Sequence, residues 1–211
     1  MTLTESEPAR FSETDLARAR DTLTAFVWER AEATRDRTGV DWRFTPDAPN
    51  TYSDLRVQWE RSRRYGVPLP ISNSDCEAVI FTEPEANAAY RYWHDVTHLE
   101  RERNFTNPHE LDMATFHLWD AEEHGLTRGS LAWRLLHADA VGNVLHWSVY
   151  REYVLNQKVF ILNVVRFGLD AALVAEAARR GILAPQVLPR GLDYTTDSAC
   201  PAHPSHLAPY P

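Results

Sequence analysis

The sequence predicts an all-α protein, a helical bundle of about six helices. Three observations support this prediction: apolar residues recur at helical spacing in several segments, capping residues and prolines precede those segments, and glycines follow them. The 211 residues, 44% of them hydrophobic, can build one substantial core. We therefore expect a single helical domain over residues 1–188, followed by an irregular proline-rich tail over residues 189–211.

The first half of the chain contains two of the predicted helices. Residues 12–37 carry an apolar stripe behind a Ser-Glu-Thr-Asp cap, and residues 52–65 form a second helix that ends before a Gly-Val-Pro-Leu-Pro stretch. The segments 40–44 and 76–81 are rich in apolar and aromatic residues. They are candidate strands, so the sequence also allows a short β-hairpin near residues 40–81.

Two further helices begin with similar signals. Thr82 is the expected cap of the third helix, which has Pro84 in its first turn and runs to about Arg103. Asn107, followed by proline and by a glutamate at the third position, is the expected cap of the fourth helix, which runs to His124 before a glycine.

The remaining helices lie in the most apolar part of the chain. The fifth begins near Leu131 and continues to Phe167 with a bend or break near Val154. The last covers residues 169–181 and is closed by a glycine.

Composition narrows the function classes. The 22 basic and 30 acidic side chains give a net charge of −8, which disfavours a broadly basic nucleic-acid surface. An arginine-rich stretch at 56–64 is interpreted as a solvated helix face. The sequence contains no uncharged apolar run long enough to be typical of a membrane span. Its two cysteines, Cys76 and Cys200, lie far apart in the sequence. We therefore expect a soluble cytoplasmic protein with reduced thiols, no membrane contact and no nucleic-acid partner.

The placement of histidine is the most informative feature. Seven of the nine histidines fall between residues 94 and 146. On the third helix His94 and His98 are four residues apart, so they lie on one face and can bind one metal ion together. The same spacing also suits two partly exposed rings at a helix interface.

Two more polar stripes accompany this pair. The fourth helix carries Glu110 and His117 seven residues apart, and the fifth carries Asp139 and His146 in an otherwise apolar segment. Carboxylates and imidazoles that project inward from facing helices are how bundles form metal sites. We predict one polar centre, with metal ligands His94, His98, Glu110 and Asp139, and with catalytic roles for Asp95, His117 and His146. Because no cysteine belongs to it, the expected ion is Zn, Fe or Mn.

Partial resemblances to known metal proteins accompany these stripes. The doublet His94-Asp95 on a helix resembles that of the all-α HD-domain metal phosphohydrolases, although no histidine precedes it. Glu110 and His117, with the spacing of residues 139, 143 and 146, resemble haem-oxygenase-like di-iron oxidases, where that last helix carries His, Asp and His rather than Asp, Asn and His. These matches assign no family.

The leading hypothesis is a metal-dependent enzyme, with a slight preference for a hydrolase of phosphate esters or similar small anionic substrates. Arg91 or Arg101 is available to meet the anion. One alternative is a non-haem iron or di-iron oxidase that uses the same ligands. Another is a non-catalytic interaction protein whose polar stripes form a buried network, with a homodimer left open.

Overall fold

The computed structural model describes residues 10–74, 78–183 and 192. Within these residues the chain forms seven helices and one pair of short strands, which confirms the all-α prediction. The elements are α1 (Glu13–Thr38), β1 (Trp42–Thr45), α2 (Tyr52–Tyr65), β2 (Leu69–Ser72), α3 (Pro84–Glu100), α4 (Asn107–Glu123), α5 (Leu131–Tyr150), α6 (Gln157–Phe167) and α7 (Leu169–Arg179). Apart from Leu192, the predicted tail lies outside the described residues.

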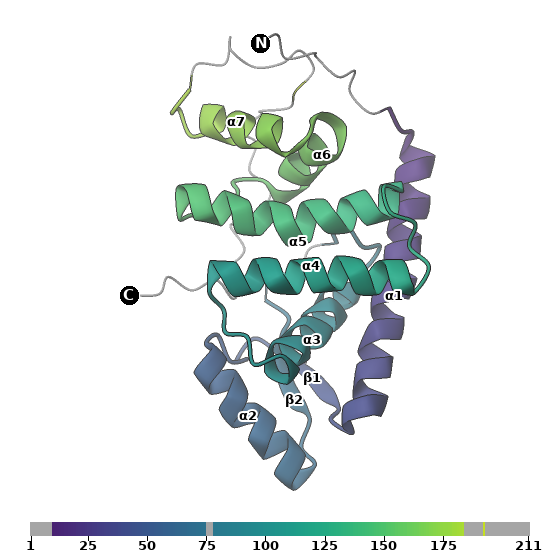
Figure 1. Ribbon diagram of the computed structural model, residues 1–211, viewed down its shortest axis with the longest axis vertical. Coiled ribbons are helices and arrows are strands. Elements are labelled where there is room, and N and C mark those ends of the chain that lie inside the picture. Colours follow the sequence, from purple (N-terminus) through teal and green to yellow (C-terminus); the bar gives the residue numbers. More distant parts are fainter. Residues whose placement is uncertain (1–9, 75–77, 184–191, 193–211) are drawn as a thin grey trace.

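The helices are stacked across one long helix. In Figure 1, α1 runs along one side of the molecule, while α4 and α5 lie one above the other and cross it. The pair α6 and α7 covers α5 at the upper end of the molecule in this view, and α2 lies at the lower end beside the two strands. Helix α3 lies behind α4 and packs along α1, so most of its surface is buried.

Two hydrophobic clusters hold these layers together. The larger joins α1, α3, α4, α5 and α6, with Leu23, Phe26 and Phe160 among its fully or nearly fully buried members. The smaller lies between α1, α2, the strands and α3, around Tyr92 and Leu55. Because α3 contributes to both clusters, its backbone is fixed from two sides, which suits a helix that carries a functional site.

The strand pair differs from the expected hairpin. β1 and β2 pair in parallel, with Trp42 opposite Leu69, because α2 intervenes as the crossover that parallel strands require. The second strand is Leu69–Ser72 rather than 76–81: residues 79–81 form bends, and 75–77 lie outside the described residues.

Most helix ends fall within two residues of the prediction. The caps of α3 and α4 are Glu83 and Thr106, each one residue from the predicted Thr82 and Asn107, because the following proline sets the first turn. The predicted break between residues 131 and 167 is confirmed by the separation of α5 and α6.

Gly142 explains how closely α5 and α6 approach. A Cβ at this position would lie 3.2 Å from Cε1 of Phe160 on α6. The absence of a side chain therefore allows the aromatic ring to pack against the α5 backbone.

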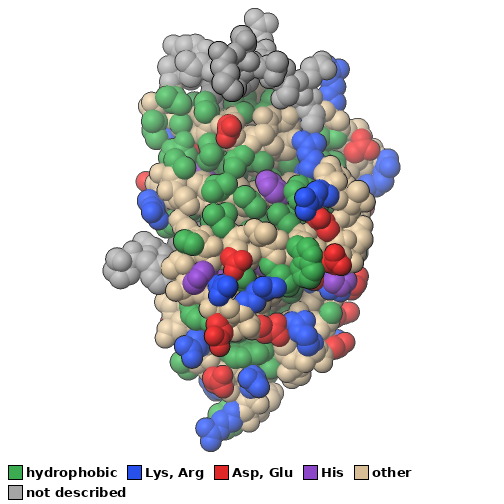
Figure 2. All heavy atoms as spheres, viewed as in Figure 1, with side chains coloured by type: hydrophobic (Ala, Val, Ile, Leu, Met, Phe, Trp, Pro, Cys, Tyr) green, Lys and Arg blue, Asp and Glu red, His purple; other side chains and the backbone are tan. Residues whose placement is uncertain are grey.

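Charged and apolar side chains are segregated on the surface. On the face shown in Figure 2, hydrophobic side chains gather over the upper half, where α5 to α7 lie, and charged side chains of both signs gather over the lower half. Among the residues that the structure describes, no helix combines the length and apolarity needed to cross a bilayer.

Candidate metal centre

The turn between α3 and α4 places the two halves of the site. Glu102 adopts a left-handed conformation (φ 54°), which reverses the chain so that Arg103 N–H donates to the carbonyl of His98 over 2.9 Å. Helix α4 then begins at Asn107. Glu110 lies in its first turn, where a carboxylate is favoured by the helix dipole, and faces back towards α3.

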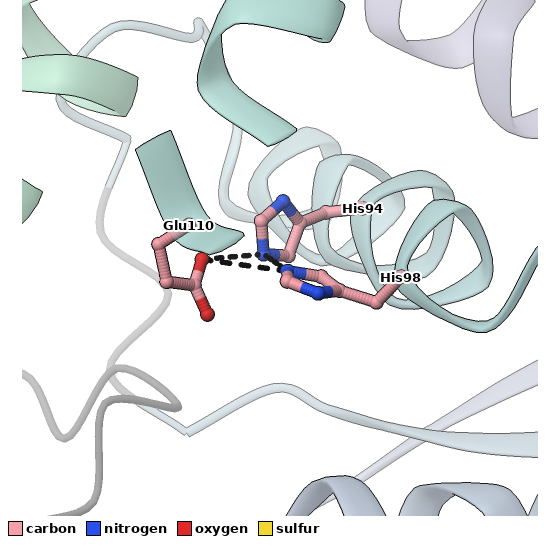
Figure 3. A group of neighbouring side chains, drawn as sticks. All are labelled: His94, His98 and Glu110. Atoms are coloured by element: carbon pink, nitrogen blue, oxygen red, sulfur yellow. Dashed lines mark hydrogen bonds and ion pairs between the residues drawn. The ribbon is translucent and has the colours of Figure 1, made fainter. Parts of the chain in front are cut away.

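Three side chains converge between these helices (Figure 3). The Nε2 atoms of His94 and His98 lie 3.0 Å apart. Oε2 of Glu110 lies 3.3 Å from Nε2 of His94 and 3.4 Å from Nε2 of His98. We call this group the His2Glu triad. It is the one set of His, Cys, Asp and Glu residues in the described part of the chain that is arranged to hold a metal ion.

The tautomer of His98 follows from its second nitrogen. Nδ1 of His98 lies 2.9 Å from the carbonyl oxygen of Arg103, which can only accept, so Nδ1 carries a proton. In the neutral ring, Nε2 then holds a lone pair directed at the carboxylate of Glu110. Because two acceptors at this distance repel, the arrangement requires a cation between them, either a proton or a metal ion.

The dimensions of the triangle suit a metal ion. Ligand atoms about 2.1 Å from one ion are separated by about 3.0 Å in octahedral and about 3.4 Å in tetrahedral geometry. The three observed edges of 3.0, 3.3 and 3.4 Å fall on these values. Glu110 Oε1 is also buried without a hydrogen-bond partner among the described residues. The triad therefore resembles the ligand set of a mononuclear site.

Burial and charge set the protonation of the triad. Burial opposes ionisation of Glu110, but hydrogen bonds from His94 and His98 outweigh it and hold the pKa of Glu110 well below its usual range. Burial also lowers the pKa of His94, and the nearby His98 adds to this effect. For His98, burial is outweighed by the hydrogen bond with Glu110, which raises the pKa. The carboxylate is therefore ready to ligate a metal ion, whereas His98 must release a proton to do so.

His117 supports the triad from α4. Its Nε2 lies 3.1 Å from Nδ1 of His94, so the N–H of His94 can donate to it while Nε2 of His94 faces the triad. Burial holds the pKa of His117 well below its usual value, and Nδ1 has no hydrogen-bond partner in the described residues. His117 is therefore a neighbour of the ligands that orients His94.

Asp95 is buried beside the ligands. Its Oδ1 has no hydrogen-bond partner among the described residues, and burial raises its pKa to about 7, opposed by the charges of His98 and Arg91. The predicted roles of Asp95 and His117 as catalytic groups are compatible with these positions and stay predictions.

The structure does not bring Asp139 into the triad. Its Oδ1 accepts hydrogen bonds from the amides of Asn143, one turn further along α5, and Gln157, at the start of α6. Burial raises the pKa of Asp139 to about 6, partly offset by these two amides. The carboxylate is thus held at the α5–α6 contact and is not a member of the triad, although its charge still acts on Tyr90 of α3.

His146 lies in a different cluster. Seven residues along α5 correspond to about 10 Å, which carries His146 away from Asp139 and under α6 and α7. Its ring packs against Tyr150 and Phe160, and its Nε2 lies 3.9 Å from Oε1 of Glu176. The predicted single polar centre is therefore two separate clusters.

Two groups near the triad were not predicted. Tyr90 stacks on the ring of His94 with centroids 6.0 Å apart, and its position four residues before His94 on α3 is a signal that could have revealed it. The carbonyl of Arg103 is a backbone group in a turn, and no sequence pattern marks such a contact.

Comparisons with models of known protein families, with curated proteins and with solved structures gave no match for this chain.

Proposed function

We propose that this protein is a metal-dependent enzyme in which His94, His98 and Glu110 hold one divalent ion. The observation that carries the proposal is the triangle of two imidazole Nε2 atoms and one carboxylate oxygen, with edges of 3.0 to 3.4 Å. Three protein ligands leave further coordination positions for a substrate or water, which is typical of catalytic rather than structural sites.

We assign hydrolysis as the leading reaction class, with a phosphate ester or similar small anionic molecule as substrate. An ion with open positions polarises a substrate oxygen and activates water at neutral pH. Asp95 and His117 are the candidates for moving a proton, because each is buried next to a ligand and has a polar atom without a partner among the described residues. The small-molecule substrate and a cytoplasmic location stay predictions from the sequence.

Metal analysis is the first test. Protein purified without added metal, or dialysed against Zn, Mn or Fe(II), should retain about one ion per chain. Glu110→Gln and His98→Ala should lose it, whereas His124→Ala, which changes a half-exposed histidine at the end of α4, should not. If Glu110→Gln binds as much metal as the parent, the triad is a structural hydrogen-bond network and the proposal fails.

The assignment of reaction class needs a second measurement. Hydrolysis of p-nitrophenyl phosphate should depend on the bound ion and should be lost in Asp95→Asn or His117→Gln protein that still binds metal. Loss of metal together with activity would instead mean that these residues orient the metal ligands.

A second candidate is a non-haem iron oxidoreductase. The observation in its favour is the composition of the triad, because two histidines and one carboxylate on one face of an ion are the usual ligands of non-haem Fe(II) oxygenases. Iron in the purified protein and substrate-dependent oxygen consumption would favour this candidate. Zinc or manganese with hydrolysis would favour the first.

A further inference from the structure

A second site candidate lies on the far side of Trp93 from the ligands. Helices α1, α3 and α4 enclose a cavity of about 230 Å³. We call it the arginine pocket, and its principal lining residues are Arg30, Arg37, Trp93, Glu100, Arg101 and Phe116. No member of the His2Glu triad lines it.

The charges of this pocket are not balanced. Glu100 is occupied by Arg37 through contacts of 3.2 and 2.6 Å. Asp120, which also lines the pocket, lies 3.6 Å from Arg30. Arg30 also contacts Glu29 over 2.9 Å and Nε2 of His124 over 2.7 Å. By contrast, the described residues offer no ion-pair partner to the side chain of Arg101. One cation, Arg101, is therefore available to a ligand.

Two of the remaining lining residues are aromatic, Trp93 and Phe116. Trp93 is almost completely buried, and the guanidinium of Arg101 lies 3.6 Å from the centroid of the Phe116 ring. Guanidinium groups bind planar carboxylates in a bidentate manner, and aromatic rings favour flat apolar partners. The volume lies below the roughly 300–1,000 Å³ of sites for drug-sized ligands, so the ligand must be small.

We propose that the arginine pocket binds a small aromatic carboxylate, with the carboxylate at Arg101 and the ring against Trp93 and Phe116. The inference does not rest on the metal site. The two regions are nevertheless neighbours, because the Trp93 ring lies 4.0 Å from that of His117.

Benzoate is the probe for this proposal. Isothermal titration calorimetry of the full chain should show benzoate binding, with at least tenfold weaker binding of acetate, which lacks the ring, and of benzamide, which lacks the charge. Inorganic phosphate, titrated into chelator-treated protein so that the metal centre is empty, should also bind at least tenfold more weakly. Equal binding of acetate or phosphate would overturn the proposal, because it would mean that the aromatic walls are not used.

Arg101→Met should weaken benzoate binding at least tenfold. Arg64→Met is the matched control, because Arg64 is also exposed and lies over an aromatic ring, Tyr65 at 5.4 Å, but does not line this pocket. Thermal unfolding of both variants without ligand checks that they fold. If Arg101→Met binds benzoate as tightly as the parent, the proposal is wrong.

A carboxylate could also coordinate a metal ion directly, so the titration is repeated with chelator-treated protein and with Glu110→Gln. Unchanged benzoate binding in both supports the arginine pocket. Loss of binding in both would place benzoate at the metal centre and contradict the proposal.

Discussion

The protein contains two buried clusters of histidine and glutamate, and their charges are balanced in different ways. In the His2Glu triad, the described residues supply no arginine or lysine partner to Glu110. In the second cluster, on α7, the fully buried Glu176 pairs with Arg179 and Arg180 and accepts the backbone N–H of Leu155 over 2.7 Å. Both clusters are largely buried, but only the second holds its own permanent cations.

This difference separates a structural network from a site built for a ligand. Glu176 connects α7 to the segment between α5 and α6, because its partners come from both sides of that contact. Glu110 instead faces two imidazoles whose lone pairs need a cation. Buried carboxylates with fixed cations stabilise a fold, whereas buried carboxylates that share lone pairs with histidines are suited to bind metal.

The largest expected effect is on the second cluster. Glu176→Gln keeps the shape of the side chain but removes the negative charge that pairs with the buried Arg179, so the free energy of unfolding should fall by about 3–5 kcal/mol. Urea unfolding in the presence of a chelator measures this change. Glu152→Gln, which removes an exposed partner of Arg180, should cost less than about 1 kcal/mol. Equal effects of the two substitutions would contradict the structural role of Glu176.

Added metal should stabilise the protein through the triad and not through the second cluster. At a free ion concentration of about 100 times Kd, binding to the folded state adds about 2.7 kcal/mol to the free energy of unfolding. Wild-type protein and Glu176→Gln should both gain this amount, because the triad is intact in each. Glu110→Gln should gain almost nothing. A metal-dependent gain in Glu110→Gln would place the ion elsewhere.

Acid should destabilise the protein through His146. Burial, with the charge of Arg180 and then Arg179, lowers the pKa of His146 to about 4 in the folded state, against 6.5 for an unperturbed histidine. Between these values the unfolded chain binds a proton that the folded chain does not. Stability therefore falls as the pH decreases from 6.5 to 4, on the order of 3 kcal/mol for this group.

His146→Gln should remove that part of the pH dependence. Urea unfolding at several pH values with a chelator present gives the slope, which should be shallower between pH 6.5 and 4 in the variant. His124→Gln, which changes an exposed histidine at the end of α4, serves as the control. An unchanged slope in His146→Gln would show that His146 does not titrate as described.

The local features of the triad could be predicted from the sequence. The spacing of His94 and His98 places both rings on one face of α3, and the proline and glutamate after Asn107 place Glu110 in the first turn of α4. Helical periodicity and capping depend on neighbouring residues alone, so they can be recognised in a single chain.

The division into two clusters could not be predicted in this way. Asp139 and His146 share a helix with a polar stripe, but which of them faces α3 depends on how α5 crosses its neighbours. Gly142 allows Phe160 to approach α5, and Glu176 reaches His146 from α7, thirty residues further along the chain. These contacts depend on long-range packing, which periodicity does not encode.

The smallest expected effects concern two turns that adjoin the clusters. Glu102 after α3 and Arg151 after α5 both have left-handed conformations, with φ of 54° and 56°, which glycine adopts without a steric cost. Glu102→Gly and Arg151→Gly should each raise the free energy of unfolding by up to about 1 kcal/mol. Glu102→Val and Arg151→Val should each lower it, because a β-branched residue is strained at positive φ.

The valine variants should differ in metal binding, since only one of the turns supports a ligand. Glu102→Val disturbs the reversal that brings the Arg103 carbonyl to Nδ1 of His98, so the affinity for metal should fall about 10-fold or more. Arg151→Val should leave it unchanged. Equilibrium dialysis at a temperature where both variants are folded measures the difference. If the two variants bind metal equally, the contact between Arg103 and His98 does not orient the ligand.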